Sequence, residues 1–257
     1  HLEEDAGKST HPSGSNYSLV DLNRAGTPLL EIVSAPDMHT AEETRAYAHE
    51  LYLLMKYAGV SDVDLYHGNM RFDVNVSVST DPDSLGTRSE TKNLNSFRSV
   101  EKAVAYEMKR QISILEKGES IVQETRGWDD AKQKTVSQRS KEDAHDYRYF
   151  PDPDIPPVVV ASSMVADITK AMPLLPAALR VNFGELGLDR SQISTLIEEP
   201  KMADIISTVL EGHDNETAKT IALWCLGELM QAVTAGKFSW EDVRGVLPMI
   251  VALSSMV

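Results

Sequence analysis

Carboxylates at widely separated positions are the residues of this sequence whose chemistry stands out. Glu3 and Glu4 are adjacent, and Glu31 interrupts the apolar run 29–33, where an acid is costly unless it is paired or bound to a metal. Asp73 lies in the middle of an alternating segment. Oxygen ligands from separate strands suit Mg²⁺, which commonly bridges to nucleotide phosphates. The cations that could hold a phosphate beside them are Arg71, Arg88, Lys92 and Arg148.

A simpler interpretation of these acids stays open at this point. Residues 3–5 would then form a solvated loop, and Glu31 would pair with a nearby arginine such as Arg24.

Three better-known catalytic or binding motifs do not fit this sequence. Residues 6–9 (AGKS) lack the earlier glycine of a phosphate-binding P-loop. The seven histidines lack the paired spacing of a zinc site, and no G-x-S-x-G elbow supports Ser/His/Asp catalysis.

Two alternating segments, residues 69–79 and 87–93, are expected to position the charged residues. The turn-rich residues 80–86 connect them, which predicts a β-hairpin. With the pairing centred on this turn, Asp73 lies opposite Lys92, and opposed residues share a face. One face is then apolar, and the other carries Arg71, Asp73, Asn75, Arg88, Glu90 and Lys92. Such a face suits a metal–phosphate site. A plain surface sheet, with cross-strand ion pairs worth at most about 1 kcal/mol each, is the open alternative.

Two amphipathic helices flank this hairpin in the sequence. The first is predicted from a Thr40/Glu43 capping box to Gly59. Its apolar stripe is expected to be Tyr47, Leu51, Leu54 and Ala58. The second helix is predicted over 96–117, with the stripe Phe97, Val100, Val104, Met108, Ile112 and Leu115. Short strands are expected near 121–125 and 134–138, and an extended segment over 146–160.

From about residue 162 the sequence changes character. Ala, Leu, Met and Ile recur with helical spacing and are interrupted by Pro and Gly, which predicts a small bundle of short helices. The sequence therefore predicts an α+β protein with a sheet-containing domain over residues 1–165 and a helical domain over residues 166–257.

Composition limits the classes of function. The chain has 257 residues with 42% hydrophobic residues and a net charge of −14, which excludes a uniformly basic nucleic-acid-coating surface and a polybasic membrane anchor. Residues 87–148 carry 13 of the 25 basic residues, so an anionic ligand is expected there. No run is long enough to span a membrane. The one cysteine, Cys225, indicates a reducing, cytoplasmic setting. Because the sequence opens on His1, we expect a fragment that lacks an N-terminal part.

Long ordered motifs over residues 1–160 resemble a known family. These motifs are HLEEDAGKS at 1–9, SLVDLNR at 18–24, GTPLLEI at 26–32, GVSD at 59–62, KNLNSF at 92–97, QETR at 123–126 and DYRYFPDPD at 146–154. Together they resemble the B subunits of the aspartyl/glutamyl-tRNA amidotransferase family. The helical part resembles that family only in position and character.

The resemblance implies a specific activity. Members form the ATP- and Mg²⁺-dependent half of a carbon–nitrogen ligase that uses glutamine as amido donor. They phosphorylate the side-chain carboxylate of Glu-tRNA(Gln) or Asp-tRNA(Asn), and ammonia from an amidase partner subunit then gives the amide. The implied fold is a glutamine-synthetase-like cradle on an antiparallel sheet, followed by a helical domain. The implied partners are the amidase subunit, a small third subunit of the heterotrimer and misacylated tRNA, with no membrane. A non-catalytic scaffold that docks tRNA and the amidase is the alternative.

Site residues follow from the resemblance by motif position. We expect Glu3, Glu31 and Asp73 to bind one metal ion, and Glu4, Arg88 and Glu90 to contact the nucleotide. Lys92, Arg71 and Arg148 are expected to contact the phosphate or the substrate carboxylate. The family's G-L-E-V-H motif and its tail domain have no counterpart in this sequence. We therefore expect this chain to be inactive alone.

Overall fold

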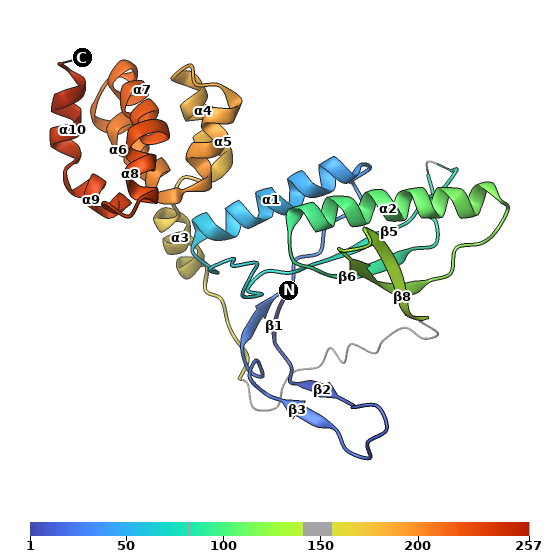
Figure 1. Ribbon diagram of the computed structural model, residues 1–257. Coiled ribbons are helices and arrows are strands. Elements are labelled where there is room, and N and C mark those ends of the chain that lie inside the picture. The colour runs from blue at the N-terminus through green and yellow to red at the C-terminus, as the bar shows by residue number, and fades with distance from the viewer. Residues whose placement is uncertain (82, 141–155, 257) are drawn as a thin grey trace. The chain divides into compact units, whose positions relative to one another are not determined.

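The computed structural model of this chain describes residues 1–81, 83–140 and 156–256 (Figure 1). Internal contacts divide the chain into two units, His1–His39 and Thr40–Val257. Helices and sheets are both present, so the predicted α+β class is confirmed. The predicted boundary between residues 165 and 166 stays a prediction.

The first unit is built from two short antiparallel ribbons. Strand β1 (Leu2–Glu4) pairs with β4 (Pro28–Leu30), and β2 (Lys8–Thr10) pairs with β3 (Leu19–Asp21). Gly7 lies before β2 close to the neighbouring strand, since a Cβ there would lie 3.2 Å from the Asp21 carbonyl oxygen and would displace the end of the Leu22 side chain. Lys8 and Ser9 lie on a strand and do not begin a helix, which agrees with the rejection of a P-loop.

The second unit contains a four-stranded sheet with the order β5-β6-β7-β8. Its strands are β5 (Phe72–Val76), β6 (Ser89–Leu94), β7 (Glu124–Asp129) and β8 (Lys134–Ser140). The β5–β6 hairpin is confirmed, and its predicted register holds over Val74–Val76 with Asn75 opposite Glu90, but an irregularity between Phe72 and Val74 shifts Phe72 opposite Leu94. The expectation of a purely antiparallel sheet is wrong for one pair, because β6 and β7 run parallel. Helix α2 separates these two strands in the sequence, and such a crossover returns the chain to the same end of the sheet.

Helices α1 (Ala41–Ala58) and α2 (Phe97–Glu116) pack beside each other along this sheet (Figure 1). The Thr40/Glu43 capping box of α1 is present, and Gly59 ends the helix with φ 65°. The predicted stripe of α1 lies on a rotated face, whereas that of α2 is confirmed at Val100 and Val104 and is wrong at Ile112. Tyr47 is 38% exposed and Ile112 is 40% exposed. The buried residues are Ala41, Thr44, Ala48, Leu53 and Tyr57 on α1, and Ser99, Val100, Ala103, Val104, Glu107 and Gln111 on α2.

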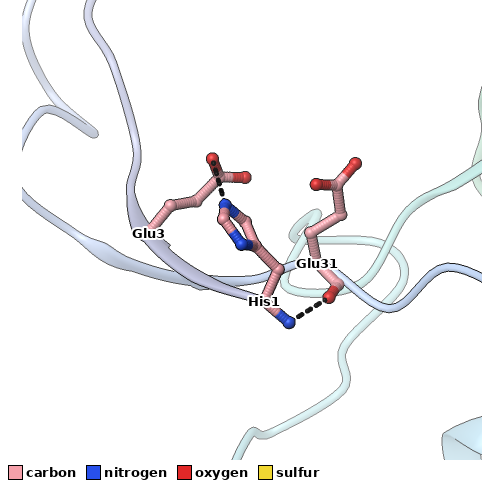
Figure 2. Close-up of side chains that lie close together, drawn as sticks. All are labelled: His1, Glu3 and Glu31. Atoms are coloured by element: carbon pink, nitrogen blue, oxygen red, sulfur yellow. Dashed lines mark hydrogen bonds and ion pairs between the residues drawn. The ribbon is translucent and has the colours of Figure 1, made fainter. Parts of the chain in front are cut away.

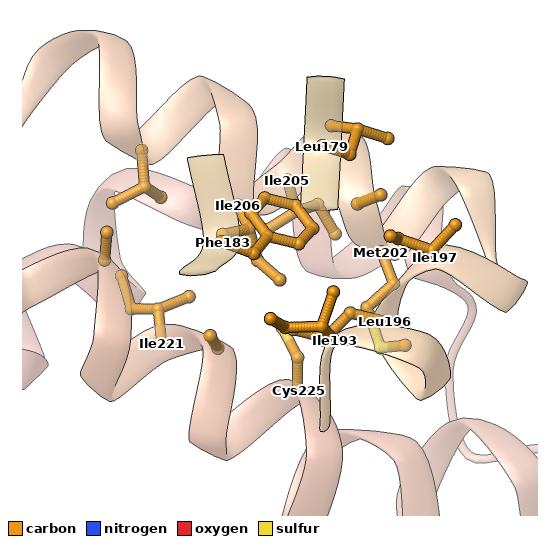
Figure 3. Packing of buried hydrophobic residues seen from close by; sticks show 14 of the residues in the cluster. Leu179, Phe183, Ile193, Leu196, Ile197, Met202, Ile205, Ile206, Ile221 and Cys225 are labelled. Carbon is orange, nitrogen blue, oxygen red and sulfur yellow. The ribbon is translucent and has the colours of Figure 1, made fainter. Parts of the chain in front are cut away.

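The C-terminal part is helical, as predicted. It comprises α3 (Ser162–Ala171), α4 (Pro176–Glu185), α5 (Arg190–Glu198), α6 (Pro200–Gly212), α7 (Asn215–Trp224), a π-helical turn (Cys225–Leu229), α8 (Met230–Thr234), α9 (Trp240–Gly245) and α10 (Leu247–Ser254). Phe183, Ile205 and Ile206 meet in its apolar core (Figure 3). Leu53 and Tyr57 of α1 belong to the same core. Within the described ranges, no helix is both long and apolar enough for a membrane span.

Candidate functional site

An imidazole and two carboxylates gather at the edge of the β1–β4 ribbon. His1, Glu3 and Glu31 each offer a ligand atom, and these atoms lie within 4.8 Å of one another. The Nε2 atom of His1 lies 3.6 Å from Oε2 of Glu3. Figure 2 shows the imidazole ring between the two glutamate side chains. We call these three residues the acidic–histidine group.

Strand pairing explains why these side chains meet. The backbone N–H of Glu31 donates to the carbonyl of His1 at 2.8 Å, and the α-amino group of His1 donates to the carbonyl of Glu31 at 3.0 Å. Opposed residues of an antiparallel pair share a face, and residues two apart on one strand share it as well. Glu3 therefore lies on the face of His1 and Glu31, whereas Glu4 points to the other face, near Gly26.

The alternative partner for Glu31 is already paired elsewhere. Arg24 Nη2, between β3 and β4, lies 2.7 Å from Oδ2 of Asp5, between β1 and β2. The alternative in which Glu31 pairs with Arg24 is therefore not supported, because Arg24 pairs with Asp5. The acidic–histidine group thus combines two carboxylates and one imidazole, a donor set that suits a divalent cation.

A second charged group lies on the sheet of the other unit. Lys92 Nζ lies 3.1 Å from Asp73 Oδ2 and 3.3 Å from Glu90 Oε1. The Thr125 hydroxyl on β7 donates to Glu90 Oε2 at 3.1 Å. The predicted cross-strand contact between Asp73 and Lys92 is therefore present. We call Asp73, Glu90, Lys92 and Thr125 the sheet-face group.

Opposing effects act on the ammonium of Lys92. Partial burial lowers the pKa of Lys92, but the hydrogen bond to Asp73 and the charges of Asp73 and Glu90 outweigh it, so the pKa is raised. The ammonium is therefore charged at neutral pH. Its two neighbouring carboxylates compensate this charge, so Lys92 does not act as an uncompensated cation in this arrangement.

The other predicted cations lie apart from these contacts. Arg71 and Arg88 are exposed and immediately precede β5 and β6. Arg148 lies outside the described residues, as does most of the extended segment predicted over 146–160. Glu3 and Glu31 belong to the first unit and Asp73 to the second, so their predicted sharing of one ion stays a prediction.

Sequence reasoning missed two members of these groups. His1 was set aside with the other histidines, although a His-x-Glu spacing on a strand puts both side chains on one face. Thr125 became a candidate only through the parallel pairing of β6 and β7, in which it lies opposite Glu90. No local pattern in the sequence indicated that pairing.

Comparison with known proteins connects these groups to a family. Residues 1–166 match the family described as the GatB/GatE catalytic domain. The chain is 45% identical over 240 residues to the B subunit of the aspartyl/glutamyl-tRNA(Asn/Gln) amidotransferase of Carboxydothermus hydrogenoformans, covering 91% of the chain and 50% of that relative. It is 47% identical over 251 residues to the protein of the same name from Synechococcus sp. (strain CC9605), covering 95% of the chain and 50% of the relative. It is 47% identical over 246 residues to the protein of that name from Janthinobacterium sp. (strain Marseille), covering 95% of the chain and 50% of the relative.

The chain thus spans about half the length of these relatives. The family match extends over the acidic–histidine group and the sheet-face group alike. With more than half of its residues matched, the chain belongs to the GatB/GatE catalytic-domain family.

Proposed function

We propose that this chain supplies the ATP-dependent part of a tRNA-dependent amidotransferase. In this reaction the side-chain carboxylate of Glu-tRNA(Gln) or Asp-tRNA(Asn) attacks the terminal phosphorus of ATP, and ADP leaves. Ammonia then attacks the acyl phosphate and releases inorganic phosphate, giving the amide. Activation is necessary because a free carboxylate has no adequate leaving group. The family match and the names of the relatives support this assignment.

The observation that carries the proposal is the acidic–histidine group. Phosphoryl transfer needs positioned groups that neutralise charge more than it needs a protein nucleophile. Glu3 and Glu31 offer the carboxylate oxygens that Mg²⁺ prefers, and His1 adds an imidazole nitrogen that suits softer divalent metals as well. The donor set therefore fits a divalent cation, which would supply charge neutralisation at the phosphates.

The sheet-face group would hold the reacting anions. Lys92 is the cation placed to contact the transferred phosphoryl group or the substrate carboxylate, and Asp73 and Glu90 orient it. Thr125 in turn orients Glu90. Arg71 and Arg88, beside the same strands, remain proposed contacts to phosphate, and Glu4 and Arg148 remain proposed from the resemblance alone.

The finer architecture and the partners belong to the same proposal. We infer a glutamine-synthetase-like cradle followed by a helical bundle, working in the cytoplasm in a heterotrimer with an amidase subunit and a small third subunit. The amidase would release ammonia from glutamine. Misacylated tRNA would be the substrate.

Substitution in the full-length protein, assembled with its partner subunits, tests the proposal. Glu31→Gln and Asp73→Asn each remove one carboxylate charge with little change in shape. The expected result is loss of ATP-dependent amidation with intact assembly. Asp37→Asn is the matched control, because Asp37 is an exposed acid of the first unit outside both groups. Retained amidation in both variants would refute the catalytic assignment and favour the tRNA- and amidase-docking scaffold. Activity on a free amino acid without tRNA would instead indicate a small-acid ligase.

A further inference from the structure

Helix α2 directs two polar side chains toward the sheet. Glu107 and Gln111 are both 0% exposed, and their four-residue spacing puts them on one helix face. A carboxylate withdrawn from water is costly unless cations and hydrogen-bond donors compensate it. The sequence predicted an apolar stripe on α2 and assigned no role to either residue.

These two side chains contact all four strands of the sheet. Gln111 Nε2 donates to the Val76 carbonyl on β5 at 2.9 Å and to Ser89 Oγ on β6 at 3.0 Å. Ser89 Oγ in turn donates to Glu107 Oε2 at 2.7 Å. Arg126 Nε on β7 lies 3.0 Å from Glu107 Oε1, and the Thr135 hydroxyl on β8 donates to the same oxygen.

Charge within this network is compensated. Arg110, one turn along α2, donates to Glu107 through Nε and Nη2, the latter at 2.7 Å. Arg126 pairs with Glu124 as well as with Glu107. Burial raises the pKa of Glu107, but the bonds from Arg110, Thr135 and Ser89 outweigh it, so the pKa is lowered and Glu107 stays ionised at neutral pH.

The network lies directly behind the sheet-face group. Side chains alternate along a strand, so Ser89 faces α2 while its neighbour Glu90 faces the other side. Neighbouring residues of β7 also face opposite sides of the sheet. Arg126 bonds Glu107 on the α2 side, and the preceding Thr125 bonds Glu90 on the other side. On the α2 side of the sheet, Glu107 thus bonds both to β6, which carries Glu90, and to β7, which carries Thr125.

We propose that Glu107 and Gln111 are positioning residues that fix β6 against β7 and thereby hold Glu90 and Lys92 in their catalytic arrangement. The catalytic part of this statement rests on the proposed function, whereas the fixing of the strands does not. A purely structural role would change the stability of the sheet and leave the turnover of the folded enzyme intact.

Two residues of β6 provide a matched test. Ser89 and Thr91 both face α2 and are 0% and 1% exposed. The Ser89 hydroxyl belongs to the network, whereas Thr91 Oγ1 makes no hydrogen bond within the part of the chain that the structure describes. Ser89→Ala and Thr91→Val each remove one hydroxyl from the same buried strand face. They avoid the variant Glu107→Ala, which leaves two arginines uncompensated and endangers folding.

Hydrogen exchange in the full-length protein, read by mass spectrometry, is the first measurement. Ser89→Ala should accelerate exchange in the peptide that covers β6 by at least about tenfold, because it removes both the hydrogen bond to Glu107 and the one from Gln111. Exchange in α6 should not change, and Thr91→Val should resemble the wild type. Equal exchange of β6 in the two variants would overturn the proposal.

Kinetics of the assembled enzyme are the second measurement. Ser89→Ala should lower kcat for ATP-dependent amidation about tenfold at unchanged KM for misacylated tRNA, and Thr91→Val should preserve both. Faster exchange without a loss of kcat would make the network purely structural and overturn the positioning role. Lys92→Ala serves as the separate check on the proposed function. If it retained full activity, the role of the sheet-face group would fail, while the exchange experiment would still decide whether the network fixes β6.

Discussion

Neutralising Glu107 should destabilise the sheet of the second unit far more than neutralising an exposed acid of the same helix. Glu107→Gln leaves Arg110 and Arg126 with Glu124 as the one nearby carboxylate among the residues that the structure describes, and their side chains are 18% and 10% exposed. Removing one partner from a buried ionic network costs about 3–5 kcal/mol. Because the amide keeps an oxygen that can accept hydrogen bonds, we expect the lower end, about 3 kcal/mol.

Local probes are needed because the chain has more than one core. Incorporated 5-fluorotryptophan gives one ¹⁹F signal each for Trp128 beside the sheet and for Trp224 and Trp240 in the helical core. For a urea dependence of about 1–3 kcal/mol per molar, a loss of about 3 kcal/mol lowers the midpoint of the Trp128 transition by about 1–3 M. Glu116→Gln, at an exposed position of α2, should change the free energy of unfolding by less than about 0.5 kcal/mol and barely move this midpoint.

The pH dependence provides an independent check with a defined sign. The folded pKa of Glu107 lies below its ordinary value of 4.5, so the unfolded chain binds more protons as the pH falls. The stabilisation from Glu107 is therefore complete above pH 4.5 and is lost as the pH falls through the folded pKa. Glu107→Gln should weaken this acid sensitivity at Trp128. A midpoint shift no larger than that of Glu116→Gln, or an unchanged acid transition, would refute the account of the network.

Three further predictions concern other parts of the molecule. Tyr57→Phe removes the donor to the Ile197 carbonyl, a buried bond of 2.9 Å, and should cost about 1–3 kcal/mol at the Trp240 ¹⁹F signal; no change there would contradict the bond. The full-length protein should bind Mn²⁺ more tightly than Mg²⁺ because of the His1 imidazole, and Glu31→Gln should restore the signal of free Mn²⁺ in electron paramagnetic resonance. The affinity of this chain for tRNA should depend only weakly on salt because of its net charge of −14; a steep dependence would indicate a concentrated basic surface.

Local signals in the sequence were sufficient for the helices and for the hairpin register. The capping box and Gly59 bound α1 because both act through backbone groups within a few residues. Asn75 pairs with Glu90 as predicted, because strict alternation allows one register that puts Val74 and Val76 on the same apolar face. These determinants are short-range, so one sequence can reveal them.

The buried faces and the parallel strand pair depend on contacts that are distant in the sequence. Gln111 is buried through bonds to β5 and β6, whereas Ile112, the expected core residue, is 40% exposed. The hydrophobicity of each residue does not reveal this change, because Val100 and Val104 keep the buried face apolar in the first half of α2 and a polar network replaces it only further along the helix. His1 was missed for a related reason, since its partner Glu31 comes from another strand.

The charges of the sheet-face group bear on how it could bind a phosphate. Lys92 lies between Asp73 and Glu90, so these three side chains together carry a net charge of −1 when all are ionised. Counted by themselves, these three side chains do not attract an anion. A divalent cation bound by either carboxylate would reverse the sign of the local charge and free the Lys92 ammonium for a phosphate oxygen. Under the proposed function, nucleotide binding therefore requires the metal first or together with the nucleotide, and the carboxylates that compensate Lys92 in the present arrangement are also the ones that release it.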